Sequence, residues 1–122
     1  MAAVSIAFEA PDNSSGAQPS SGRPIDMVHL ERQTMGDKAL EIEILQLFAR
    51  NARAMLQELS HADAIKMKAL AHKLKGAADA VGAFGVSAAA EEVENGSHDA
   101  ASLAKIATSV ISAENFILKL CR

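Results

Sequence analysis

A histidine with lysines and a glycine beside it is the group of residues in this sequence best suited to chemistry. His72 lies three residues before Lys75, four before Gly76 and four after Lys68, spacings that bring side chains together on a helix. A neutral imidazole has a lone pair on one ring nitrogen and can act as a nucleophile. A phosphoryl group attached there would bring close to two negative charges, which Lys75 could screen, helped by Lys68 or Lys73. This group therefore predicts a histidine that carries phosphoryl groups.

The glycine and alanines beside the histidine predict an accessible surface. Gly76 falls inside a helical pattern, where glycine costs about 1 kcal/mol relative to alanine, so its presence in an alanine-rich helix needs a reason. The missing Cβ leaves room beside the imidazole for an attached group and for the backbone of another protein. Ala69, Ala80 and Ala83 are expected to keep the same side flat. The predicted partner-binding residues are Ile65, Lys68, Ala69, Lys73 and Asp79.

The charges around the histidine favour an anionic partner surface. Neither a metal site nor a nucleotide-binding site is expected, for reasons of spacing and motif. The segment 63–82 contains four lysines and two aspartates, a net charge of +2 in a chain whose total is −3. The four histidines form no i,i+4 pair, and His61 and His72 are about three helical turns apart, so no metal site is expected. Without a phosphate-binding loop, nucleophile elbow or paired carboxylates, we expect no cofactor and no ATP-using active site. An ordinary surface histidine among solvated lysines is the plain structural alternative.

The composition favours an all-helical protein of one domain. The 122 residues are 49% hydrophobic, with no Trp or Tyr and four Phe, and they are rich in helix-forming residues. The net charge of −3 does not favour nucleic-acid binding. The single cysteine, Cys121, excludes an internal disulfide and a cysteine-based zinc site. No apolar run approaches the roughly 18 residues of a membrane span, and no Lys or Arg precedes the first apolar residues. We therefore expect a cytoplasmic protein without a signal peptide or membrane contact.

Helical periodicity and capping residues divide the chain into a leader and five helices. Residues 1–23 lack periodicity and are rich in Ser, Gly and Pro, which predicts a disordered leader before a helical domain at 24–122. The helices are expected from Asp26 to about Met35, and over about 38–59, 64–81, 86–95 and 99–120. Four start at aspartates and three end at glycines, namely Asp26, Asp37, Asp63, Asp99, Gly36, Gly82 and Gly96. Short loops predict an antiparallel four-helix bundle, with the short first helix covering one end or side.

Each long helix has one apolar face that is expected to be buried. His72 lies roughly 160° from the centre of its own helix's apolar face and should point outward. In the helix 38–59 the predicted face excludes Glu41. The predicted core residues of the four long helices are Leu40, Ile44, Leu47, Phe48, Met55, Leu56, Leu59, Met67, Leu70, Ala71, Leu74, Ala77, Ala78, Val81, Val86, Ala89, Ala90, Val93, Leu103, Ile106, Ala107, Val110, Ile111, Ile117 and Leu120.

The pattern His72-x-Leu74-Lys75-Gly76, followed by Gly82, resembles the signature of the histidine-containing phosphotransfer (HPt) domain. The resemblance covers about residues 25–121. It implies that His72 accepts a phosphoryl group from an aspartate of a receiver domain and passes it to another, reversibly. It also implies that Lys75 steadies the phosphohistidine and that Gly76 leaves it accessible. The partners would be receiver domains of response regulators or hybrid histidine kinases, which would supply the Mg²⁺.

The resemblance also implies a polar residue about 22 positions after the histidine, which is Glu94 here. A carboxylate that accepts from Nδ1–H would leave Nε2 free to attack. Glutamate at this position resembles the phosphotransfer domain of chemotaxis kinases, whereas many relay proteins have glutamine. The alternative is that Glu94 is a solvated member of an acidic run that starts at Glu91. Ala77, Ala78 and Ala80 depart from the serine or asparagine of many members, which removes possible hydrogen bonds near the site.

The sequence therefore predicts a phosphorelay intermediate that carries the phosphoryl group covalently and is not an enzyme in the usual sense. Lys73 follows His72 directly, unlike the acidic residue in the histidine box of dimeric sensor kinases. No ATP-binding domain is recognisable in the sequence either, so autophosphorylation is not expected. A monomer is expected. The main alternative is an HPt-like module that binds receiver domains without accepting phosphate, and a third is a structural bundle with an incidental histidine.

Overall fold

The computed structural model describes residues 23–121, which form five helices. They are α1 (Met27–Thr34), α2 (Lys38–Leu59), α3 (Ala64–Val81), α4 (Phe84–Glu94) and α5 (Ala100–Leu120). No strand occurs in this range, so the predicted all-α fold class is confirmed. The predicted leader lies outside the described residues, apart from Arg23.

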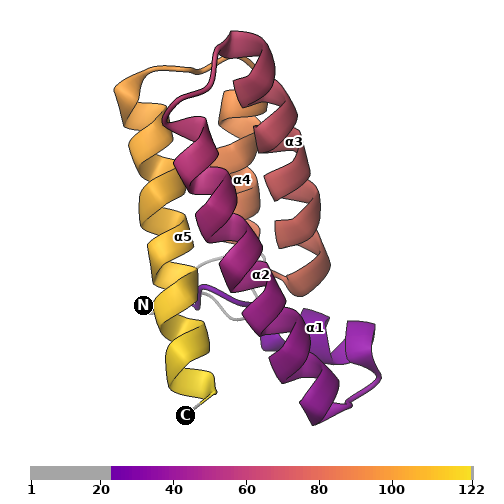
Figure 1. Ribbon diagram of the computed structural model, residues 1–122. Coiled ribbons are helices and arrows are strands. Elements are labelled where there is room, and N and C mark those ends of the chain that lie inside the picture. Colours follow the sequence, from indigo (N-terminus) through magenta and orange to yellow (C-terminus); the bar gives the residue numbers. More distant parts are fainter. Residues whose placement is uncertain (1–22, 122) are drawn as a thin grey trace, which may run out of the picture.

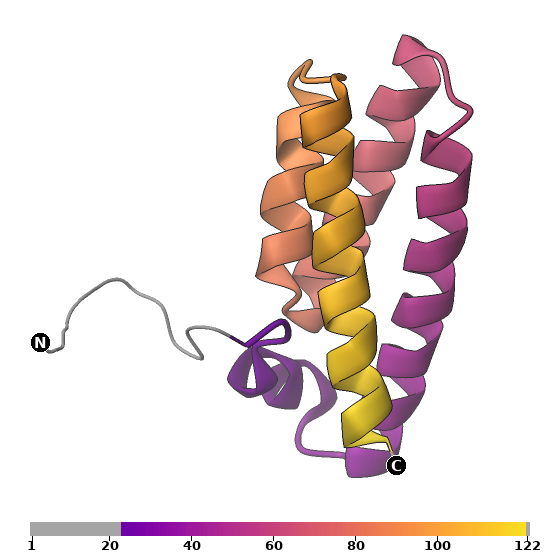
Figure 2. The same ribbon diagram turned by 90° about the vertical axis from the view of Figure 1, so that its left-hand side faces the viewer.

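The four long helices form a bundle in which α2 contacts α3 and α5, and α4 contacts α3 and α5. Figure 1 shows α5 and α3 on opposite sides of the bundle, with α2 in front and α4 behind. The short α1 packs across α2 and α3 near one end, which is visible at the lower end in Figure 2. The predicted antiparallel bundle with a covering N-terminal helix is therefore confirmed. None of the described helices is both long enough and apolar enough to cross a membrane.

Four helices start where their aspartates predict. Asp26 accepts hydrogen bonds from two backbone N–H groups of α1, and the other three caps each accept one from the first turn of their helix. The bonds of Asp37, Asp63 and Asp99 are 3.1, 2.8 and 2.8 Å long. The start of α4 was predicted at Val86 and lies two residues earlier, at Phe84. Ala83 precedes it and offers no side-chain cap, so the sequence contained no start signal there.

Gly82 joins the end of α3 to the segment that precedes α1. Its φ of 84° lies in the left-handed region, as a glycine after a helix often does. Its carbonyl also accepts a hydrogen bond from the backbone N–H of Asp26 at 2.9 Å. A Cβ on Gly82 would lie only 2.8 Å from the backbone oxygen of Asp26. Glycine is therefore required here both to end α3 and to seat α1.

The core agrees with the predicted faces of α3 and α4 and with most of the predicted face of α2, where Phe48 and Leu59 are buried and Ile44, Met55 and Leu56 pack against the core. In α2, Leu40 and Leu47 are exposed, whereas Leu45, Ala52 and Glu41 are buried. The buried face of α2 contacts α3 and α5, and near the start of α2 Thr34 of α1 donates a hydrogen bond from Oγ1 to the buried Glu41 carboxylate at 3.3 Å. Two predicted core residues of α5, Ile111 and Leu120, are also exposed. Fully buried side chains include Ile25, Leu30, Leu45, Leu74, Val93 and Ile106.

Candidate functional site

His72 projects from the middle of α3 into solvent. Its side chain is 72% exposed, whereas the opposite face of the same helix buries Leu70, Ala71, Leu74, Ala78 and Val81 in the core. The imidazole is thus held on a rigid, well-packed helix while its ring remains accessible. A macromolecule can reach this ring without any rearrangement of the bundle.

Glu94, at the end of α4, contacts the ring from the neighbouring helix. Its Oε2 lies 2.7 Å from Nδ1 of His72, and its side chain is only 20% exposed. A carboxylate can only accept a hydrogen bond, so this contact assigns the proton to Nδ1. In the neutral ring the other nitrogen, Nε2, then has a free lone pair that faces solvent. The contact that the sequence resemblance implied is therefore present.

Lys75 extends from α3 across to the same carboxylate. Its Nζ lies 3.9 Å from Oε1 of Glu94 and 3.9 Å from Oε2 of Glu91, and its side chain is 32% exposed. Oε1 of Glu94 is buried and has no hydrogen-bond partner among the described residues. Lys75 therefore supplies the positive charge nearest to this oxygen. The site consists of an exposed ring, a mostly buried carboxylate and a lysine whose ammonium lies close to that carboxylate.

Glu91 is a site residue that sequence reasoning did not identify. In the sequence, Glu91 is recognisable only as the first residue of an acidic run. Glu91 lies three residues before Glu94, and Lys75 lies three residues after His72. If α3 and α4 are assumed to be antiparallel with His72 beside Glu94, this equal spacing predicts a contact between Lys75 and Glu91. The spacing alone does not reveal that α3 and α4 face each other along these two edges.

Gly76 is exposed, and a Cβ built at this position would meet nothing within 4 Å. The internal packing of the bundle therefore does not require a glycine here, in contrast to Gly82. A side chain at position 76 would occupy the space outside the helix, beside the imidazole. This observation is in keeping with the predicted role of Gly76 in access to His72.

The five predicted partner-binding residues are all exposed, and Ile65 is the most prominent apolar residue among them, at 84% exposure. Lys73 lines a shallow depression together with Asn51, Ala54, Met55 and Glu58 of α2. The accessible surface around His72 therefore reaches α2 on one side and α4 on the other. Ala83 was expected on this surface and is instead fully buried, because it lies in the tight connection after Gly82.

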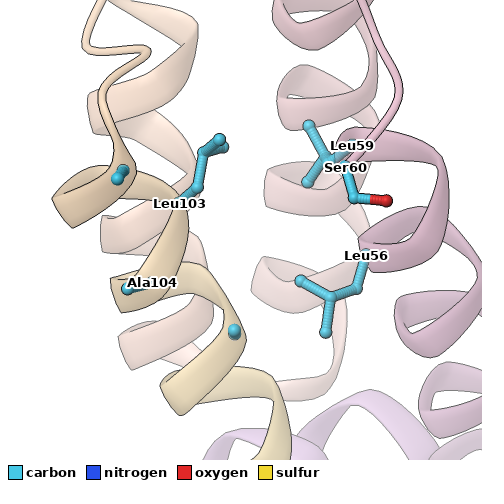
Figure 3. Close-up of a pocket in the computed structure, with 7 residues that line it drawn as sticks. Leu56, Leu59, Ser60, Leu103 and Ala104 are labelled. Carbon is cyan, nitrogen blue, oxygen red and sulfur yellow. The ribbon is translucent and has the colours of Figure 1, made fainter.

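A separate apolar groove lies between α2 and α5. It is lined by Leu56, Leu59 and Ser60 of the α2 end and by Leu103 and small residues of α5, as Figure 3 shows. None of the residues around His72 lines it. Among the described residues, no group of three or more His, Cys, Asp or Glu side chains is placed to hold a metal ion. The chemical features of the molecule thus converge on the surface around His72.

The chain matches a known protein family. A family model described as the Hpt domain matches residues 43–114, more than half of the chain. The matched range runs from α2 to α5 and contains His72, Lys75, Gly76 and both glutamates of the site. The comparisons with curated proteins and with solved structures gave no match.

Proposed function

This chain belongs to the Hpt domain family, and on that basis we propose that it shuttles a phosphoryl group between receiver-domain aspartates through His72. Hpt domains are phosphocarrier modules that act in phosphotransfer in two-component systems and interact with receiver domains. The observation that carries the finer proposal is the 2.7 Å contact between Nδ1 of His72 and the Glu94 carboxylate. In the neutral ring this contact favours the tautomer with the proton on Nδ1, so that the lone pair of Nε2 faces solvent, which is the state that a nucleophile needs.

In the proposed reaction, the Nε2 lone pair of His72 attacks the phosphorus of a receiver's aspartyl phosphate. The Nε2–P bond forms as the bond between phosphorus and the carboxylate oxygen breaks, and the electron pair leaves with the aspartate. No proton has to move, because Nδ1 keeps its hydrogen throughout. The ring becomes cationic, and the Glu94 carboxylate stabilises that charge. In the reverse direction the Nε2–P bond breaks toward another aspartate, and the electron pair returns to Nε2.

Lys75 is proposed to stabilise the phosphorylated ring, since its ammonium can turn from the glutamates toward the phosphoryl oxygens. Gly76 is proposed to leave space for that group and for the backbone of the receiver. The Mg²⁺ required for transfer is expected on the receiver, so the chain supplies orientation and charge rather than a cofactor. Receiver contacts are proposed at Ile65, Lys68, Ala69, Lys73 and Asp79, all on the accessible surface around His72.

The test is incubation with a phosphorylated receiver domain. The parent protein should acquire acid-labile, base-stable phosphate, and His72→Gln should acquire none while keeping its helicity. His61→Gln is the matched control, because His61 is also exposed but lies in the turn between α2 and α3. Labelling of the His72 variant would contradict the proposal. Binding of the receiver without any labelling of the parent protein would favour the docking module instead.

A further inference from the structure

We propose that Glu91 is a positioning residue that holds Lys75 against α4 and thereby makes phosphorylated His72 less stable and readier to pass its phosphoryl group on. This inference rests on the proposed carrier function and adds a residue to it. Its basis is the position of Lys75, whose Nζ lies 3.9 Å from a carboxylate oxygen of each of two glutamates.

The two glutamates hold the lysine in different environments. Glu94 is mostly buried, and its Oε1 is buried without a hydrogen-bond partner among the described residues, so the nearby ammonium compensates a poorly solvated oxygen. Glu91 is 53% exposed and can be solvated when the lysine leaves. Glu91 therefore adds a second, weaker attraction that keeps Lys75 on the α4 side of the imidazole.

Phosphorylation of His72 would place a third anionic group within reach of the same lysine. Moving the ammonium toward the phosphoryl oxygens would weaken its attraction to the two carboxylates. Glu91 thus competes with the phosphoryl group for Lys75. Because the Glu91 pair is partly solvated, removing its charge should have a modest effect, between about 1.5-fold and 5-fold.

The experiment measures how the phosphoryl group partitions at equilibrium between a receiver domain and this protein. For Glu91→Gln we expect the ratio to shift by about 1.5-fold to 5-fold toward phosphorylated His72, with slower hydrolysis of the phosphohistidine. Glu92→Gln is the matched control, because it makes the same charge change on the same helix. Both Glu92 carboxylate oxygens accept from Lys105 of α5 at 3.1 Å, so Glu92 belongs to another ion pair. Its substitution should leave the partition ratio unchanged.

A second pair of variants tests whether Glu91 acts through the lysine. In a Lys75→Met background, Glu91→Gln should no longer change the partition ratio. An unchanged ratio for Glu91→Gln in the parent background, a shift away from His72, or an equal shift in the Lys75→Met background would each overturn the inference. Failure of the parent protein to accept phosphate at all would remove the carrier function, and the role of Glu91 with it. A labelled parent with an unaffected Glu91 variant would remove the role of Glu91 alone.

Discussion

At the scale of single residues, the ring of His72 contacts a side chain that lies 22 positions away in the sequence. Helical periodicity predicted correctly that His72 points outward, because that requires only the apolar face of its own helix. The contact with Glu94 was anticipated through the family resemblance alone. Glu91 was missed because its proximity to Lys75 depends on how two helices face each other, which no single-helix pattern contains.

Removing the Glu94 carboxylate should release the ring proton from Nδ1. In Glu94→Ala we expect ¹⁵N NMR of the His72 ring to show loss of the Nδ1–H tautomer, and transfer to slow by about tenfold. Glu94→Gln is the control, because its amide oxygen can still accept from Nδ1–H without a negative charge. Glu94→Ala with the same tautomer as the parent protein would mean that the carboxylate does not orient the ring.

At the scale of secondary-structure elements, the sequence predicted helix starts wherever an aspartate caps the first turn. It failed at α4, since Ala83 has no side chain that could cap a helix. The role of Gly82 was half predicted. Its position after α3 indicated a helix end, but the close approach of Asp26 is a contact between distant parts of the chain and could not be read locally.

Substitution by alanine should have opposite effects on stability at Gly76, within α3, and at Gly82, at its end. Gly82→Ala introduces strain at a φ of 84° and a Cβ 2.8 Å from the Asp26 backbone oxygen, so we expect a loss of about 1–3 kcal/mol in the free energy of unfolding. Gly76→Ala adds a Cβ into open space within a helix and should gain about 0.5–1 kcal/mol. Urea denaturation measures both. Equal effects in the two variants would contradict this difference between the glycines.

The capping aspartate of α5 predicts a pH dependence of stability. The backbone N–H of Ser102, followed by its hydroxyl, donates to Asp99 and lowers the pKa of its carboxyl. Because the pKa of Asp99 is lower in the folded state, its charge stabilises the fold at pH values above the unfolded-state pKa of about 3.9. This stabilisation is lost as the pH falls through the folded-state pKa. Asp99→Ala should therefore have a lower Tm than the parent protein at pH 7.

The difference in Tm between Asp99→Ala and the parent protein should shrink as the pH is lowered below about 4. Asp99→Asn serves as the control, because an asparagine caps the helix but does not titrate over this range. A difference that stays constant from pH 7 to pH 2.5 would show that the charge of Asp99 does not contribute.

At the scale of the whole molecule, the fold class could be predicted from the sequence. Which face of each helix packs against its neighbours could not be predicted in full. The helices of a bundle are recognisable because each has a 3.6-residue apolar period and short connections to the next. The face of α2 was predicted only in part, because the three- and four-residue spacing of its apolar residues also included Leu40 and Leu47, which are exposed. The short α1 instead draws Glu41 into a buried contact with Thr34, a tertiary effect that overrides the local pattern.

The measurement that tests the central claim most directly is the position of the phosphoryl group on the protein after transfer from a phosphorylated receiver domain. Histidine-selective ¹⁵N labelling and NMR can identify both the residue and the ring nitrogen. The predicted result is phosphate on Nε2 of His72 with the proton still on Nδ1 beside Glu94. Phosphate on Nδ1 of His72, or on another histidine, would contradict the account.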